Sequence, residues 1–359
     1  MILYKDNVHN FYEIFNPETG CLLRSDVILD GKETTTPAPM RSFPELIDVG
    51  IMGHCHAAKS GLCKSFGIDC YQNGHSLVRK NLPLEKYKSL LDQCRNRVYQ
   101  IVLGGAGDPI KHEKFQEILR LTKEANIIPN LTTTGFLLNN HETNLIKQYC
   151  GAVAVSFYSR LDACLNETSP VTLRAIQQLL DAKCRVNIHY VLSRETVSEA
   201  TLRLKQNLFP KGINGVIFLL YKPIGEGVSS KALTTADSDY IQFLTVAQEN
   251  NFSFRIGFDT CQTPALRKFC GKLNRDSIEP CEAARFSMYI DSNFKAYPCS
   301  FACHDENFQL DLNDISLFEA WNSSSFSKFR ESQQKACSGC HQVHCYKCVL
   351  ESDLNFCTG

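Results

Sequence analysis

The sequence predicts an α/β fold built from parallel βαβ units, which would form either a doubly wound sheet or a complete or partial barrel. Two observations predict it. Short apolar runs alternate with amphipathic helical segments from Leu46 to Phe258. Beyond Phe258 the alternation stops and cysteines become frequent, which indicates a second domain stabilised by bound metal. We therefore divide the chain into an N-terminal segment (1–45), an α/β core (46–258) and a cysteine-rich domain (259–359).

Seven apolar runs of the core are expected to be strands, with helices between them. The strands are Leu46–Met52, Val98–Leu103, Ile127–Leu131, Ala152–Phe157, Val186–Leu192, Val216–Tyr221 and Phe252–Phe258. Helices are expected at Leu84–Cys94, around Phe115–Leu121, around Glu142–Tyr149, after a Ser169 cap with Pro170 at the first position, and near Asp239–Gln248. The N-terminal segment is expected to hold two short strands around a turn at Asn16–Gly20, then a connector at Thr34–Pro39.

The composition excludes several classes of protein. Lys and Arg together number 38, as do Asp and Glu, so there is no electrostatic footprint for nucleic acid or an anionic membrane. No apolar run approaches the roughly 20 residues of a membrane span, and the first residues form no signal core. We therefore expect a cytoplasmic protein. Disulfides are rare in that compartment, so the 18 cysteines are expected to include metal ligands.

The loop after the first expected strand carries three cysteines. Cys55, Cys63 and Cys70 are spaced Cys-x7-Cys-x6-Cys, and no fourth cysteine stands near. Thiolate sites hold zinc or iron–sulfur clusters, and zinc sites usually have tight Cys-x2-Cys pairs, which this loop lacks. A four-iron cluster held by only three cysteines keeps one iron open for a small molecule. The loop therefore favours a cluster, with three unrelated thiols as the alternative reading.

Glycine-rich or polar turns end the next three strands. Gly104-Gly105-Ala106-Gly107-Asp108-Pro109 follows the second strand, Thr134-Gly135 the third, and Ser156 lies at the end of the fourth. Because carboxyl ends of parallel strands share one edge of a sheet, these turns and the cysteine loop should meet on one rim. In this order, on successive strands, they resemble the site of a radical S-adenosylmethionine enzyme.

The resemblance covers about residues 46–258 and implies a partial (β/α)6 TIM-type barrel. In that family the open iron of a [4Fe–4S] cluster chelates S-adenosylmethionine, whose C–S bond is split to give a 5′-deoxyadenosyl radical that abstracts hydrogen from an unactivated carbon. Carried over, Cys55, Cys63 and Cys70 would bind the cluster. Contacts with S-adenosylmethionine would come from Gly104, Gly105, Gly107, Asp108, Thr134, Gly135 and Ser156. The usual family loop is Cys-x3-Cys-x2-Cys; the wider loop still permits ligation, since loop-closure entropy grows slowly with length.

The C-terminal cysteines resemble the SPASM domain of the same superfamily, which holds two auxiliary [4Fe–4S] clusters. The family pattern implies one cluster on Cys261, Cys281, Cys299 and Cys348 and another on Cys337, Cys340, Cys345 and Cys357, with the assignment of Cys345 and Cys348 left open. Phe294 departs from the pattern, because a turn glycine is usual before Cys299. Residues 337–348 alone would also suit a zinc knuckle. Expected non-ligands are Cys270, Cys303, His341 and His344, and small buried residues are expected at Cys21, Cys94, Cys150, Cys164 and Cys184.

Radical enzymes with such an extension most often modify peptides or protein side chains. We therefore expect a maturase that abstracts hydrogen from a ribosomally made precursor peptide and modifies its backbone or a side chain. A weaker likeness, carried by Gly53–Cys55 and Cys70–Gly74, is to splicease-like maturases with nitrile-hydratase-like leader peptides. It would allow excision of tyramine to leave an α-keto-β-amino acid. Two alternatives stay open: anaerobic oxidation of a Ser or Cys on a protein, and a zinc-binding interaction protein without catalysis.

The expected partners follow from the same resemblance. They are the precursor peptide, an electron donor such as flavodoxin or ferredoxin, and a separate protein that recognises the leader peptide. Such maturases usually need a leader-recognition domain, and the first 45 residues are too short to supply one. The sequence singles out no catalytic acid or base, because Asp and Glu are too numerous.

Overall fold

One ten-stranded sheet dominates the computed structural model, which describes residues 1–359 except 162–165, 235, 250, 275–276, 336–347 and 351–359. Its order is β14-β13-β12-β9-β8-β7-β6-β15-β16-β17. The first eight strands in this order pair in parallel. The strands of the core are β6 (Leu46–Gly50), β7 (Gln100–Gly104), β8 (Ile128–Thr133), β9 (Val153–Ser156), β12 (Val186–Leu192), β13 (Gly215–Leu220) and β14 (Arg255–Phe258).

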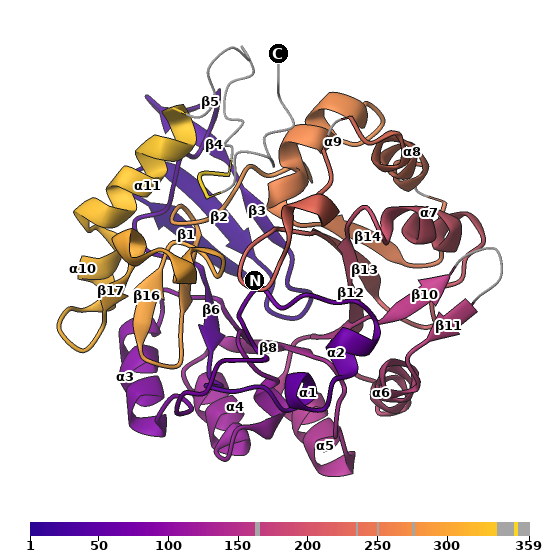
Figure 1. The fold of residues 1–359 in the computed structure, drawn as a ribbon. Helices are drawn as coiled ribbons and strands as arrows, with labels where there is room; N and C mark the ends of the chain where they lie inside the picture. Colours follow the sequence, from indigo (N-terminus) through magenta and orange to yellow (C-terminus); the bar gives the residue numbers. More distant parts are fainter. Residues whose placement is uncertain (162–165, 235, 250, 275–276, 336–347, 351–359) are drawn as a thin grey trace.

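Helices cover the outer face of this curved sheet, which gives the predicted partial barrel (Figure 1). Alternate residues of each strand face the helices: along β12, Ile188 is fully buried, whereas Asn187 and His189 point to the barrel interior and are partly exposed. The helices are α3 (Leu84–Cys94), α4 (Phe115–Glu124), α5 (Asn140–Tyr149), α6 (Pro170–Asp181), α7 (Val197–Lys205), α8 (Ser238–Ala247) and α9 (Thr263–Phe269).

The predicted elements are largely confirmed. α3 has the predicted bounds, because its apolar residues recur at helical spacing and are buried against the sheet. Ser169 caps α6 by accepting a hydrogen bond from the Thr172 N–H, and Pro170 takes the first position. The expected connector Thr34–Pro39 is wrong in part, because its β-branched threonines lie in β5 (Lys32–Pro37), paired with β4 (Asp26–Leu29). α7 was not predicted.

The C-terminal part continues the sheet of the core. β15 (Ser287–Ile290) pairs in parallel with β6 and sets Tyr289 beside Asp48. β16 (Lys295–Tyr297) and β17 (Leu310–Asp311) extend the sheet in antiparallel fashion, with α10 (Leu317–Trp321) and α11 (Ser324–Lys335) following. The predicted border after residue 258 thus separates segments of one sheet, and the division into domains stays a prediction.

The N-terminal segment packs across the amino ends of the barrel strands. β1 (Ile2–Asp6), β2 (Phe11–Phe15) and β3 (Leu22–Arg24) form an antiparallel sheet, and β2 and β3 are joined by the predicted turn at Asn16–Gly20. Pro17 and Gly20 from this turn line a cavity of about 270 Å³ together with Gln100, Asn130 and Asn187 of the barrel interior. The turn therefore covers the end of the barrel opposite to the strand ends that carry the site.

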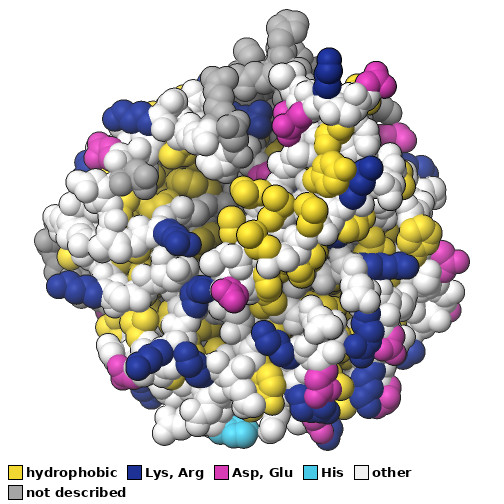
Figure 2. Space-filling view, turned by 180° about the vertical axis from the view of Figure 1, so that it is seen from behind, with side chains coloured by type: hydrophobic (Ala, Val, Ile, Leu, Met, Phe, Trp, Pro, Cys, Tyr) yellow, Lys and Arg dark blue, Asp and Glu magenta, His cyan; other side chains and the backbone are white. Residues whose placement is uncertain are grey.

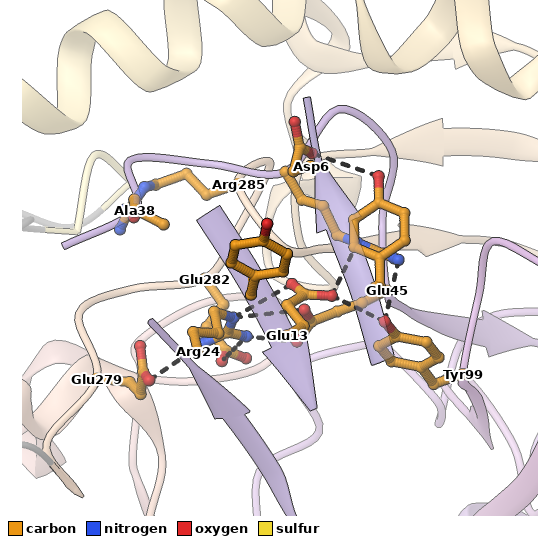
Figure 3. Close-up of polar contacts among 12 residues, drawn as sticks. Asp6, Glu13, Arg24, Ala38, Glu45, Tyr99, Glu279, Glu282 and Arg285 are labelled. Atoms are coloured by element: carbon orange, nitrogen blue, oxygen red, sulfur yellow. Dashed lines mark hydrogen bonds and ion pairs between the residues drawn. The ribbon is translucent and has the colours of Figure 1, made fainter. Parts of the chain in front are cut away.

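A buried polar cluster fastens this segment to the rest of the chain (Figure 3). The Arg24 side chain, 8% exposed, lies among four carboxylates. It pairs with Glu45 at the start of the barrel, with Glu13 of β2, and with Glu279 and Glu282 of the C-terminal part. The cluster thus joins three separate stretches of sequence.

The outer face of the N-terminal sheet carries exposed apolar side chains. Leu3, Ile14 and Leu23 stand opposite one another on its three strands and are 42–69% exposed. Figure 2 shows the molecule from behind, and hydrophobic side chains gather near the middle of that face. Among the described residues, no helix combines the length and apolar character needed to cross a membrane.

Candidate functional site

The three-cysteine loop lies between β6 and α3 and contains two short helices, α1 (His56–Lys59) and α2 (Leu62–Ser65). Cys55 caps α1, and its Sγ accepts a hydrogen bond from the Ala58 N–H at 3.3 Å. The Sγ of Cys63 lies 3.4 Å from the Tyr158 hydroxyl, which follows β9. The Sγ of Cys70 accepts from the Gly74 N–H at 3.2 Å. Each sulfur is thus oriented by a polar group of the surrounding chain.

The structure brings these three thiols together. A Cβ placed on Gly74 would lie 3.0 Å from Cys70 Sγ and 3.4 Å from Cys55 Cβ. Cys55 and Cys70 thus both lie against the backbone of Gly74. The pKa of the Cys63 thiol is raised to about 11, mainly by burial and to a smaller extent by the charges of Cys55 and Cys70, against the opposing effect of the Tyr158 hydrogen bond. Sequence reasoning missed Tyr158, because no motif ties this residue to a cysteine distant in the chain.

A single metal ion and an iron–sulfur cluster require different arrangements of their ligands. Among the described residues, no three His, Cys, Asp or Glu side chains converge closely enough to share one metal ion. A zinc ion would need its ligands about 2.0–2.3 Å away. An iron–sulfur cluster is larger, and each cysteine binds a different iron, so neighbouring but separate thiolates are what it requires.

The glycine-rich turn after β7 packs directly on the cysteine loop. A side chain at Gly107 would clash with the carbonyl oxygen of His54, next to Cys55. Gly105 has a φ of +96°, and a Cβ there would lie 2.8 Å from both Gly50 Cα and the Tyr289 hydroxyl. A Cβ on Gly104 would meet nothing within 4 Å. Gly104 therefore borders open space, in which a small molecule can approach the backbone of this turn.

Asp108 closes this turn and links it to the end of β8. Its Oδ2 accepts hydrogen bonds of 2.8 Å from the Thr133 hydroxyl, the Thr134 hydroxyl and the Thr134 N–H. Its Oδ1 is buried without a hydrogen-bond partner in the structure. Burial raises the pKa of Asp108, which hydrogen bonds from Thr134, Thr133 and the Ile110 backbone partly offset. An unsatisfied buried carboxylate oxygen is costly, and a bound ammonium group would satisfy it.

The other two predicted contacts lie on the same rim. Gly135, at φ +74°, leaves no room for a Cβ, because Ala175 of α6 packs against it. Ser156 ends β9, and its carbonyl oxygen accepts from the Thr172 hydroxyl at 3.4 Å. The structure thus gives Gly135 a packing role against α6, and its contact with S-adenosylmethionine stays a prediction, like that of Ser156.

Four of the C-terminal cysteines also lie together. Burial raises the pKa of Cys261, Cys281 and Cys299, and the charge of Cys348 raises each further. These are the four residues of the first predicted auxiliary set. The second set, Cys337, Cys340, Cys345 and Cys357, lies outside the described residues, as do His341, His344 and Cys164.

The remaining cysteines take other positions. Cys94 is fully buried, Cys270 is 3% exposed, and Cys150 and Cys184 pack partly buried against the core. Cys21 is exposed, so its prediction as a buried residue was wrong: it follows the β2–β3 turn at the surface. Cys303 lies 3.5 Å from Gln72 Oε1, beside the three-cysteine loop.

Comparisons with known proteins agree with this arrangement. Residues 281–346 match the family model of the SPASM domain, described as an iron-sulfur cluster-binding domain. SuiB of Streptococcus suis, solved bound to S-adenosylmethionine, superposes with a TM-score of 0.65 at 16% identity, covering 88% of this chain and 76% of SuiB. Native anSMEcpe with bound AdoMet superposes with a TM-score of 0.58 at 17% identity, covering 85% of this chain and 88% of anSMEcpe. No curated protein matches.

These matches show the fold of the chain and the kind of domain at its C-terminal end. The chain carries a SPASM domain on a barrel with the fold of SuiB and anSMEcpe. The predicted SPASM domain and the predicted barrel fold are therefore confirmed. The splicease-like subgroup stays a prediction.

Proposed function

We propose that this protein is a radical S-adenosylmethionine enzyme that modifies a peptide. One observation carries the proposal: the three-thiol loop packs against a glycine-rich turn that offers open space at Gly104 and an unpartnered carboxylate oxygen at Asp108. Thiolates for a cluster and a recognition site for an amino acid moiety thus stand side by side. Neither a zinc site nor an interaction module requires the second feature.

The residues would divide the work as follows. Cys55, Cys63 and Cys70 would hold a [4Fe–4S] cluster, which supplies the electron that cleaves S-adenosylmethionine to a 5′-deoxyadenosyl radical. Gly104, Gly105 and Gly107 would let the backbone lie along the methionine moiety. Asp108 Oδ1 would accept a hydrogen bond from the ammonium group of the methionine moiety. Thr134 would hold the Asp108 carboxylate in place through its hydrogen bonds to Oδ2.

The strand ends beside this site leave room for a peptide. A cavity of about 470 Å³ lies there, lined by Phe66 and Asp69 of the cysteine loop, Val191, Tyr221 and Lys231. SuiB has been solved with precursor peptide SuiA, and anSMEcpe with a Cp18Cys peptide. A peptide substrate here rests on this cavity and on the shared fold. The atom attacked would then be a backbone or side-chain carbon of a precursor peptide.

The cluster count and the further partners are part of the proposal. Two auxiliary [4Fe–4S] clusters would occupy the C-terminal sets, and an electron donor such as flavodoxin or ferredoxin would reduce the enzyme. A separate leader-recognition protein is also proposed. If the purified chain alone binds and converts its peptide at full rate, this last partner is not needed.

The test is a product assay with the anaerobically reconstituted protein, a reductant, S-adenosylmethionine and a panel of precursor peptides. Formation of 5′-deoxyadenosine together with a peptide mass change supports the proposal. Loss of a tyramine unit would assign splicease chemistry, and loss of two hydrogens from a Ser or Cys would assign the oxidising alternative. Peptides that stay unchanged while 5′-deoxyadenosine forms would remove the peptide part of the proposal.

A further inference from the structure

Lys222, the second residue after β13, is a buried cation that the sequence analysis did not single out. Its side chain is 2% exposed. The ammonium donates to Asp259 Oδ2 at 2.8 Å and to the Leu220 carbonyl oxygen at 3.0 Å, and it lies 4.2 Å from the centre of the Phe301 ring. Burying an ammonium group costs free energy unless the group is paired. A buried lysine–aspartate pair often stabilises a fold no more than apolar residues of similar size would. Its presence therefore invites a functional explanation.

The surroundings place Lys222 between the two cysteine sites. Phe301 follows Cys299 by two residues, and its ring lies 4.7 Å from that of Tyr71, which follows Cys70. The loop that continues from Lys222 reaches the same point, because the Glu226 N–H donates to the Cys70 carbonyl oxygen at 3.0 Å. Lys222 thus stands where the barrel, the three-cysteine loop and the C-terminal part meet.

The Lys222–Asp259 pair lies beside the first auxiliary set. Asp259 stands two residues before Cys261, and its Oδ2 accepts from the Lys222 ammonium at 2.8 Å. Phe301, whose ring centre lies 4.2 Å from the Lys222 Nζ, stands two residues after Cys299. These contacts orient the ammonium group at the two segments that carry Cys261 and Cys299.

Asp259 is held so that this orientation persists. Its Oδ2 also accepts from the Leu220 N–H at 3.2 Å, and its Oδ1 accepts from the Gln262 side chain at 3.0 Å. Gln262 is fully buried and donates in addition to the Phe218 carbonyl oxygen at 2.7 Å. Backbone and side-chain bonds from β13 and the segment that carries Cys261 thus fix the pair.

We propose that Lys222 is a positioning residue that sets the reduction potential of the cluster on Cys261, Cys281, Cys299 and Cys348. The inference rests on the proposed function, which places a cluster there. A cluster bound by four thiolates carries net negative charge, and reduction adds one electron to it. A fixed cation nearby stabilises the reduced form, so it makes the cluster a better electron acceptor.

The test compares reduction potentials, measured by anaerobic redox titration with electron paramagnetic resonance. The parent is the Cys55→Ala/Cys63→Ala/Cys70→Ala variant, in which the auxiliary clusters are observed alone. Lys222→Met should lower the ratio of reduced to oxidised cluster about tenfold at a fixed potential, a shift of 59 mV for one electron. Lys222→Arg should stay close to the parent. Asp259→Asn should shift the potential in the opposite direction, and Lys272→Met, on the exposed surface, should not change it.

Opposite shifts in Lys222→Met and Asp259→Asn establish the charge role, because a merely structural role would move both variants the same way. An unchanged potential in Lys222→Met with its iron retained overturns the inference, as does Lys222→Arg behaving like Lys222→Met. If Lys222→Met loses its iron, the sign of the Asp259→Asn shift decides. A parent without any iron–sulfur signal overturns the proposed function and this inference with it.

Discussion

The carboxylate of Asp108 accepts two hydrogen bonds from Thr134, one from the backbone N–H and one from the hydroxyl, each 2.8 Å long. These bonds tie the glycine-rich turn after β7 to the end of β8. They use one carboxylate oxygen and leave the other buried without a partner. The strand ends of the barrel therefore carry a fixed anionic acceptor beside the cysteine loop.

Replacing Asp108 by Asn should weaken binding of S-adenosylmethionine. The substitution keeps the size of the side chain but removes its charge, and a hydrogen bond to a charged group contributes roughly 1.5–3 kcal/mol. We expect the Kd to rise about ten- to a hundredfold by isothermal titration calorimetry on the reconstituted protein. Asp92→Asn, on the exposed surface of α3, is the control. An unchanged Kd in Asp108→Asn would remove this residue from the site.

Adjacent glycines should respond differently to alanine. Gly105→Ala forces a Cβ against Gly50 and Tyr289 at a φ of +96°. The free energy of unfolding should therefore fall by about 1–3 kcal/mol, which appears as a lower thermal unfolding midpoint. Gly104→Ala meets open space and should leave the midpoint nearly unchanged. It should nevertheless lower the affinity for S-adenosylmethionine. Equal stability losses in both variants would contradict the geometry of the turn.

Arg24→Met should destabilise the fold strongly. The substitution keeps the apolar bulk but leaves Glu45 buried without its cation, whereas Glu13 keeps its ion pair with Arg41. Breaking a buried ion pair from one side costs about 3–5 kcal/mol. Urea denaturation followed by circular dichroism measures this. The additional change Glu45→Gln should recover part of the loss, because it removes one of the stranded charges. No recovery in the double variant would argue against a purely electrostatic origin.

The contribution of Asp48 to the free energy of unfolding should fall as the pH rises from about 4 to 7. This residue alternates with Ile47 and Val49, which face the helices, so it points to the barrel interior. Burial raises its pKa to about 7, with Glu282 adding to the rise. The folded chain thus holds this proton more tightly than the unfolded chain, and the cost of ionising it appears between about pH 4 and 7.

Asp48→Asn should remove that slope. At pH 8 the variant should be more stable than the wild type, by roughly 2–4 kcal/mol at most, and near pH 4 the two should agree. Urea midpoints of the metal-free chain across this pH range provide the measurement. A stability difference between wild type and Asp48→Asn that stays constant from pH 4 to 7 would show that Asp48 ionises as it does in water.

Features of this structure that depend on neighbouring residues could be predicted from the sequence. Helix α3 and the Ser169–Pro170 start of α6 follow from spacing and capping, which act within a few residues. The order of cysteine loop, glycine turn and Thr-Gly along successive strands was enough to place them on one rim, because parallel strands share that edge. Long-range pairings carry no such signal.

Three features show what was missing. The pairing of β15 with β6, which brings Tyr289 against Gly105, depends on residues far apart in the chain. The contact of Tyr158 with Cys63 crosses the barrel rim in the same way. The Lys222–Asp259 pair looks like any two surface charges in the sequence, because burial is set by neighbours that no periodicity reveals.

The most direct measurement of the central claim is 5′-deoxyadenosine formation by the reconstituted protein, alongside the iron content per chain. We predict about twelve irons in the wild type, the content of three four-iron clusters. Cys55→Ala/Cys63→Ala/Cys70→Ala should lose about four of them and all nucleoside formation. Zinc in place of iron, or nucleoside formation that persists without these three cysteines, would contradict the account.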